Sequence, residues 1–267
     1  MNRMYEEFTP ELTVESVGAV RIIRLNRPEQ FNAVNEHLHW GLANIWEALR
    51  ADREARAAVL TGSGRAFSAG GDLDWFSEIQ EDRYVRERTL REARHIVSGP
   101  IELPIPVVAA VNGPATGLGC SLAVLCDLVF MADTAYVADP HVAIGLVAGD
   151  GGAVLWPALM SIIHAKEFVF TGDRISAEKA VQLGLANRVV EGDDLLQTAV
   201  EYAHRLAELP PQALRATKQV MNMHLQRAVL HTLDMALVTE NESFQMPEHH
   251  ERVKALIARN KSKKEAR

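Results

Sequence analysis

The sequence predicts an α/β domain with parallel strand pairing. Short apolar runs typical of buried strands recur between segments that have the spacing of amphipathic helices. Two of these runs end in glycine turns that open helices, and beyond about residue 193 only helical patterns remain. We therefore expect a core over residues 1–192 and a C-terminal helical region over residues 193–267.

The first strands and helix are predicted before residue 62. Residues 12–15 and 20–25 read as two strands joined by a turn near Gly18, and residues 57–62 read as a third, buried strand. Between them, residues 35–50 should form an amphipathic helix. Its apolar residues recur at helical spacing: Leu38, Leu42, Ile45, Trp46 and Leu49.

The middle of the chain repeats this order. Residues 78–94 are dense in charge and predict a solvated helix or a mobile segment. A buried strand is expected at 105–111 and another at 128–132, with an apolar helix at 120–126 that opens at the glycine turn 117–119.

The last part of the chain loses its strand signal. Ser176 should cap a helix that stops at Gly184, and residues 187–190 form a short strand or edge. We then expect helices at 194–208, 211–228, 229–245 and 248–260. This region is too small for a core of its own, so it should pack on the main domain or on another subunit.

Composition excludes several classes of protein. The 267 residues carry a formal net charge of -7, which argues against nucleic-acid binding because that requires a dominant basic face. No apolar run approaches membrane-spanning length and no secretory signal is evident, so we expect no membrane partner and a cytoplasmic location. Cys120 and Cys126 lack metal-ligand spacing, so we expect two reduced core cysteines and no metal.

Two glycine loops are the candidate binding elements. The loop Ala69-Gly70-Gly71 follows the strand at 57–62, and Gly117-Leu118-Gly119 follows the strand at 105–111. Glycines let a ligand approach the backbone, and unpaired N–H groups at a helix start favour negative charge. Because ligands collect at the carboxyl ends of parallel strands, both loops should face one pocket. The alternative is a pair of ordinary strand-to-helix turns.

The order and spacing of these motifs resemble the crotonase superfamily, also called the enoyl-CoA hydratase/isomerase family. The resemblance covers nearly the whole chain and rests on motifs at residues 25–33, 60–73, 106–120, 126–127 and 171–177. It implies a spiral of βαβ turns whose C-terminal helices build trimers, often paired into hexamers. It also implies an oxyanion hole made by the backbone amides of Gly71 and Leu118, which would bind a carbonyl of an acyl-CoA and stabilise its enolate. No cofactor is implied beyond the coenzyme A of such a substrate. Further substrate contacts are expected from Ala69, Gly70, Asp72, Leu73, Ser121 and Trp40.

The chain departs from the family's hydratases at the two glutamates that add water. The matching positions are Ser121 and His141. Syn addition of water needs paired groups that exchange roles as acid and base, and a serine has no suitable pKa for this. Ordinary hydration is therefore not the favoured reaction.

A second resemblance suggests another reaction. His39, His141, Asp150 and Glu240 fall at positions similar to the catalytic set of the family's β-diketone hydrolases, of which 6-oxocamphor hydrolase is an example. That likeness implies hydrolytic C–C cleavage of a β-dicarbonyl group, of the retro-Claisen type. His141 would be the general base and Asp150 would orient it, with Glu240 and His39 assisting. Leu118 departs from this pattern, because those enzymes place a histidine there.

Simpler interpretations and other functions remain open. Asp150 could be a helix N-cap, His39 a structural histidine and Glu240 an exposed charge on a late helix. The protein could also be an enoyl-CoA hydratase or isomerase with Asp150 as its only acid–base group, or a non-catalytic acyl-CoA-binding member. The expected substrate is an acyl-CoA or a cyclic diketone.

Overall fold

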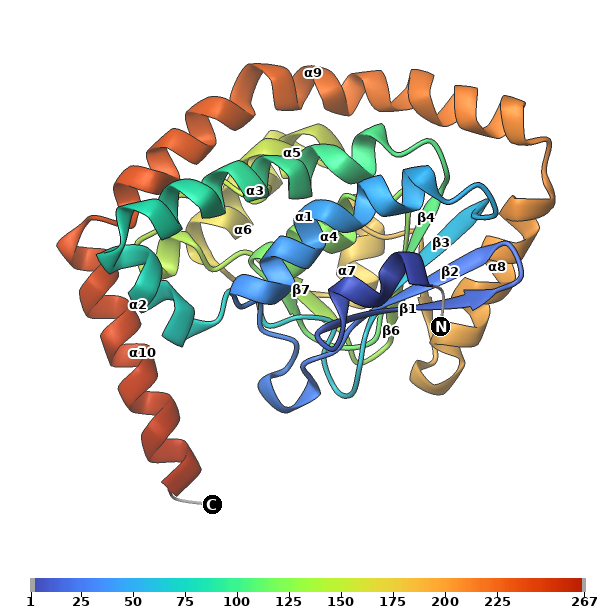
Figure 1. Ribbon diagram of the computed structural model, residues 1–267. Coiled ribbons are helices and arrows are strands. Elements are labelled where there is room, and N and C mark those ends of the chain that lie inside the picture. The colour runs from blue at the N-terminus through green and yellow to red at the C-terminus, as the bar shows by residue number, and fades with distance from the viewer. Residues whose placement is uncertain (1–2, 266–267) are drawn as a thin grey trace.

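A computed structural model describes residues 3–265, and its main feature is a six-stranded sheet (Figure 1). The strand order is β1-β2-β3-β4-β6-β9, and only β1 pairs antiparallel with its neighbour. The strands are β1 Leu12–Val17, β2 Val20–Leu25, β3 Ala57–Gly62, β4 Val107–Val111, β6 Leu128–Ala132 and β9 Arg188–Val190. From β2 to β6, each strand is added beside the preceding one after a helical crossover, so the predicted α/β fold with parallel pairing is confirmed.

A small second sheet is formed by segments that follow β4 and β6 along the chain. Its order is β5-β7-β8, with β5 Ala115–Thr116, β7 Tyr136–Ala138 and β8 Ile175–Ser176. The helices of the core are α1 Glu36–Ala51, α2 Leu73–Glu81, α3 Arg83–Glu102, α4 Leu118–Val124, α5 Gly152–Leu159, α6 Ile162–Thr171 and α7 Ala177–Leu183. Short 3-10 turns occupy Arg3–Phe8, Pro28–Gln30, Val142–Ile144 and Gly192–Asp194.

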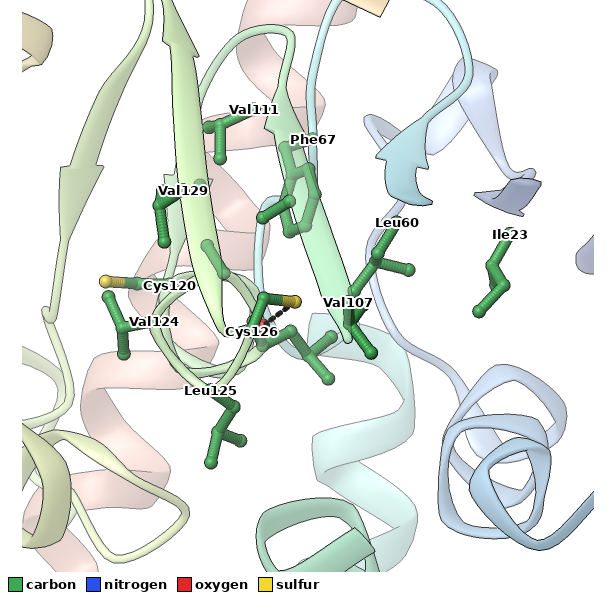
Figure 2. Packing of buried hydrophobic residues seen from close by; sticks show 14 of the residues in the cluster. Ile23, Leu60, Phe67, Val107, Val111, Cys120, Val124, Leu125, Cys126 and Val129 are labelled. Carbon is green, nitrogen blue, oxygen red and sulfur yellow. Dashed lines mark hydrogen bonds between the residues drawn. The ribbon is translucent and has the colours of Figure 1, made fainter. Parts of the chain in front are cut away.

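The core lies between the sheet and these helices, as Figure 2 shows in part. All residues of β3 and β4 are buried, because helices cover both faces of a parallel sheet. Both cysteines are free and buried there, as predicted, and the Cys126 thiol donates to the carbonyl of Leu122 at 3.3 Å. Burial raises the pKa of both thiols, which keeps them unreactive.

The C-terminal region contains three helices instead of the four predicted. They are α8 Leu195–Glu208, α9 Pro211–Ser243 and α10 Pro247–Glu265. The predicted break near residue 228 is wrong, because no glycine or proline interrupts the helix there and α9 continues for 33 residues. α8 packs on the sheet, α9 crosses α3 and α5, and α10 turns back against α2 (Figure 1). The proposed boundary between residues 192 and 193 stays a prediction.

The charge-dense segment at 78–94 is ordered helix rather than a mobile stretch. Asp82 separates α2 from α3 and caps α3, because its carboxylate accepts hydrogen bonds from the amides of Tyr84 and Val85 at 2.7 and 3.3 Å. Arg86 and Thr89 on α3 are buried despite their polarity. Among the residues described, no helix is both long and apolar enough to cross a membrane.

Candidate active site

One cavity brings together the principal residues predicted from the sequence. Its lining includes Gly71, Leu118, His141, Asp150, Glu240 and His39, together with apolar side chains from α2 and α3 and the side chain of Phe244, which follows α9. About 40 Å³ is open to the centres of water molecules, compared with roughly 10–15 Å³ needed for one. The cavity therefore has room for ordered water beside the ionisable groups.

The first glycine loop holds Gly71 at the edge of the cavity. The carbonyl of Gly70 accepts from the amide of Val34 at 2.7 Å, and the amide of Asp72 donates to the carbonyl of Val34 at 2.9 Å. Gly70 has a φ of +84°, which favours glycine. Gly71 lies between these two bonds, and its own N–H has no acceptor in the described part of the chain.

The second loop places Leu118 at the first position of α4. An N–H at this position has no partner within its helix, and no described residue accepts a hydrogen bond from it. Gly117 precedes it with a φ of +54°, and a β-carbon there would lie 3.4 Å from Cε1 of His141. Both predicted oxyanion-hole amides are therefore unpaired, and both residues line the same cavity.

His141 is held between two carboxylates. Its Nδ1 lies 2.5 Å from Oδ1 of Asp139, and its Nε2 lies 3.6 Å from Oδ2 of Asp150. Asp139 thus fixes Nδ1 as the protonated nitrogen. The expectation that Asp150 orients His141 is corrected, because Asp139 occupies Nδ1 and Asp150 faces the other nitrogen.

Neighbouring charges shift the pKa values of both His141 and Glu240, and Asp150 contributes to both shifts. Burial lowers the pKa of His141, but Asp139 and Asp150 raise it more, so this pKa lies well above 6.5. Burial and the charge of Asp150 raise the pKa of Glu240 well above 4.5, although the charge of His141 opposes them. Glu240 therefore tends to keep its proton while Asp150 is ionised beside it.

Glu240 reaches the cavity from the middle of the C-terminal region. It is buried on α9, so the interpretation of an exposed charge is wrong. A β-carbon at Gly149 would lie 2.6 Å from Oε2 of Glu240, so a glycine is required for this close approach. Asp150 follows Gly149 in the chain. It does not cap α5, because the N-cap residue of that helix is Gly151 and no side chain caps it.

Ser121 lies behind Asp150. Its hydroxyl is fully buried and lies 3.4 Å from Oδ1 of Asp150 and 3.4 Å from the carbonyl of Gly117. It is not among the cavity-lining residues. Ser121 therefore supports Asp150, and direct substrate contact stays a prediction.

His39 enters the cavity from α1. It is buried, and its Nδ1 lies 2.7 Å from Oε2 of Glu92 on α3. Its ring centroid lies 5.1 Å from that of Trp75. Like His141, His39 thus has a carboxylate on Nδ1, but no described residue is hydrogen-bonded to its second nitrogen.

The remaining predicted substrate contacts lie outside the cavity lining. Asp72 caps α2 and pairs with Arg27 at 2.9 Å, and Trp40 packs against Phe8 with ring centroids 5.6 Å apart. Ala69, Gly70 and Leu73 flank Gly71 in the chain without lining the cavity. The tryptophan that lines it is Trp75.

Three residues of the site are not among those predicted from the sequence. They are Asp139, Glu92 and Trp75. Asp139 stands two residues before His141, a spacing that could have been noticed. Glu92 lies within a run of charges and carries no local signal, and Trp75 is an aromatic residue of the kind most often found in a core.

One group of described residues could hold a metal ion. His141, Asp150 and Glu240 offer ligand atoms that all lie within 4.8 Å of one another. The same three groups are the candidate acid–base residues of the site.

The model of the enoyl-CoA hydratase/isomerase family matches residues 15–265. The chain belongs to this family. It is 34% identical over 233 residues to a short-chain-enoyl-CoA hydratase of Clostridium acetobutylicum, covering 86% of this chain and 87% of that protein. It is 32% identical to the 2,3-dehydroadipyl-CoA hydratase of Escherichia coli, covering 92% of this chain and 95% of the relative. The crotonase assignment made from the motifs is thus confirmed.

Solved structures of this family extend the comparison. An enoyl-CoA hydratase/isomerase from Mycobacterium paratuberculosis superposes with a TM-score of 0.90 at 53% identity, covering 92% of this chain and 98% of that one. A β-diketone hydrolase from the cyanobacterium Anabaena, bound to (S)-3-oxocyclohexyl acetic acid, gives 0.83 at 25% identity, covering 90% and 97%. The crotonase fold is therefore shared with relatives whose names denote two different reactions.

Proposed function

We propose that this crotonase hydrolyses a carbon–carbon bond of a β-dicarbonyl substrate. The observation that carries the proposal is the His141 side chain, with Asp139 on Nδ1 and Asp150 near Nε2. A carboxylate that fixes one imidazole nitrogen leaves the other as a proton acceptor, which is the arrangement of a general base that activates water or a hydroxyl.

The geometry provides a place for the attacking water. Nε2 of His141 and Oδ2 of Asp150 are 3.6 Å apart, too far for a good direct hydrogen bond, and a water in the cavity can bridge them. As this water bonds to a substrate ketone carbon, its proton passes to Nε2. The ketone oxygen then carries the negative charge of a tetrahedral adduct.

Collapse of the adduct breaks the bond between the former ketone carbon and the central carbon. The electron pair moves into the second carbonyl group to form an enolate, and the former ketone becomes a carboxylic acid. The amides of Gly71 and Leu118 are unpaired and suited to hold the enolate oxygen. The proton held by His141 then passes to the central carbon, directly or by relay through Glu240, and this completes the hydrolysis with one water consumed.

The β-diketone hydrolase among the solved neighbours supports this proposal. The apolar lining from Val34, Trp75, Phe76, Leu146 and Phe244 suits a hydrocarbon ring or acyl chain. The proposed substrate class is therefore a cyclic β-diketone or a β-oxoacyl-CoA.

Enoyl-CoA hydration is a second candidate. Asp150 and Glu240 are neighbouring carboxyl groups whose environments differ, and the pKa of Glu240 is raised beside the charge of Asp150. Such a pair can divide acid and base roles. The names of the curated relatives also favour hydration.

Product analysis distinguishes the two reactions. Purified protein would be incubated with a cyclic β-diketone, with a β-oxoacyl-CoA and with crotonyl-CoA, and released carboxylic acid or hydrated product would be quantified. We expect one carboxylic acid per bond cleaved, and loss of this activity in His141→Ala. The matched control is His164→Ala, which changes an exposed histidine on α6.

Two outcomes would contradict the proposal. Rapid hydration of crotonyl-CoA that survives His141→Ala would assign hydratase chemistry to the carboxyl pair. Tight binding of CoA thioesters without turnover of any of these compounds would indicate a non-catalytic acyl-CoA-binding protein.

A further inference from the structure

Trp75 lines the cavity, and its indole has a buried hydrogen-bond donor without a partner among the described residues. Only 6% of this residue is exposed, and its Nε1 has no partner among the described residues. Trp46 and Trp156 also have unpartnered Nε1 atoms, but only Trp75 lines the cavity. A buried donor without a partner costs free energy, so a ligand that accepts its hydrogen bond would recover that cost.

His39 lies beside this indole with one ring nitrogen free. Glu92 occupies its Nδ1 at 2.7 Å, and the ring centroid is 5.1 Å from that of Trp75. No described residue is hydrogen-bonded to Nε2. Arg88 lies 3.9 Å from the second oxygen of Glu92, which helps to hold that carboxylate in place.

A β-dicarbonyl substrate has two oxygens that become charged in turn. The tetrahedral adduct carries its charge on the attacked ketone oxygen, and the enolate carries it on the other oxygen. Two backbone amides at one point can hold only one of these oxygens in a fixed pose. The hydrolysis proposed above therefore needs a second set of donors in the same cavity.

Resting on that proposed function, we propose that Trp75 and His39 form a second oxygen-binding subsite, which holds the ketone attacked by water. The Nε1–H of Trp75 donates to the ketone oxygen, and His39 lies beside the indole with its Nε2 available to the same end of the substrate. Glu92 is a positioning residue, because it acts through His39. Gly71 and Leu118 hold the other oxygen, so the cavity selects substrates with two carbonyl groups.

Binding without turnover tests this subsite. In the His141→Ala background, two ligands would be titrated by calorimetry: a cyclic β-diketone with two methyl groups on its central carbon, and the matching monoketone. We expect the diketone to bind about tenfold more tightly, as one good hydrogen bond allows. Adding Trp75→Phe should reduce its affinity about tenfold and leave the monoketone within about twofold.

Control variants separate the subsite from general damage. Trp46→Phe removes another unpartnered indole outside the cavity lining and should preserve the ratio of the two affinities. Glu92→Gln should lower this ratio, and Glu92→Asp should partly restore it. Urea unfolding of each variant shows whether it is folded under the binding conditions.

The results distinguish this inference from the proposed reaction. Equal affinities in the His141→Ala background, or an equal loss for both ligands with Trp75→Phe, would overturn the subsite. A diketone preference that Trp75→Phe abolishes would support it, even if the unmodified protein released no carboxylic acid. In that case the proposed reaction alone would be wrong.

Discussion

His141 Nδ1 lies 2.5 Å from Oδ1 of Asp139, and Asp139 also accepts a hydrogen bond from the backbone amide of His141 at 3.2 Å. One carboxylate oxygen therefore fixes both the ring and the main chain of the same residue. Asp150 remains on the side of the ring where water can bind. The pair of Asp139 and His141 is thus the orienting unit of the site.

Asp139→Asn should shift the pH dependence of hydrolysis. Burial lowers the pKa of His141, but Asp139 and Asp150 together raise it well above 6.5. The base form exists only above that pKa, so the rate of the unmodified protein should rise with pH through it. Without the charge of Asp139, this rise should move to lower pH, and the maximal rate should fall by on the order of 10²-fold. A pH–rate profile of kcat checks this; an unmoved rise would exclude His141 as the base.

Glu240→Gln should separate stability from activity. The pKa of Glu240 is raised above 4.5 in the folded protein by burial and by Asp150. Below pH 4.5 the carboxyl is protonated in both states. As pH rises above this value, the unfolded state releases the proton first, so folding loses stability until the folded pKa is passed.

The neutral amide removes this loss. We expect the variant to be more stable than the unmodified protein at pH 8 by about 1–2 kcal/mol, with little difference at pH 4. Its hydrolytic rate should fall if Glu240 transfers a proton. Urea unfolding at both pH values measures the first effect. This explanation would be contradicted if the stability of the variant, relative to that of the unmodified protein, were lower at pH 8 than at pH 4.

Gly71→Ala should impair the oxyanion hole. A β-carbon at Gly71 would lie 2.3 Å from the ring of Phe76, so the loop or the ring must move. Displacing one donor of such a hole reduces kcat by roughly 10²–10³-fold. Leu118→Ala is the matched control, because it shortens a side chain and retains the backbone amide, so its rate should stay within about tenfold. Equal losses in both variants would show that cavity shape, not the amide position, limits the rate.

Arg21→Met should destabilise the fold at a residue outside the cavity lining. The guanidinium of Arg21 is buried and pairs with Asp52 at 2.7 Å, and Tyr5 donates to the same carboxylate at 2.8 Å. Removing the cation leaves a buried carboxylate without its charge partner, which costs about 3–5 kcal/mol. Arg50→Met is the control, because its pair with Glu47 is largely exposed and contributes about 0–1 kcal/mol. Urea unfolding compares them, and similar losses would show that burial is not the cause.

Local patterns in the sequence were sufficient to predict the scaffold and the two glycine loops. Strand-like apolar runs and glycine turns are set by residues adjacent in the chain, so β3, β4 and both loops could be predicted. The continuity of α9 differs from the two helices predicted there, because no glycine or proline follows Pro211 within the helix. The fact that α10 turns back against α2 depends on packing and has no local signal.

The division of roles in the site required the tertiary structure. His39 and Glu92 are 53 residues apart, and Glu240 reaches Gly149 from a distant helix, so no short pattern links them. Trp40 follows His39 on one helix, where successive side chains point about 100° apart. When His39 faces the cavity, Trp40 therefore faces Phe8.

Contiguous motifs were enough to predict the family, the parallel α/β scaffold and the candidate site residues His141, Asp150, Gly71 and Leu118. The folded chain was needed to show that Asp139 contacts His141, that Glu240 is buried and that Trp75 lines the cavity. The physical reason is that orientation and pKa depend on charges and burial supplied by elements distant in the chain.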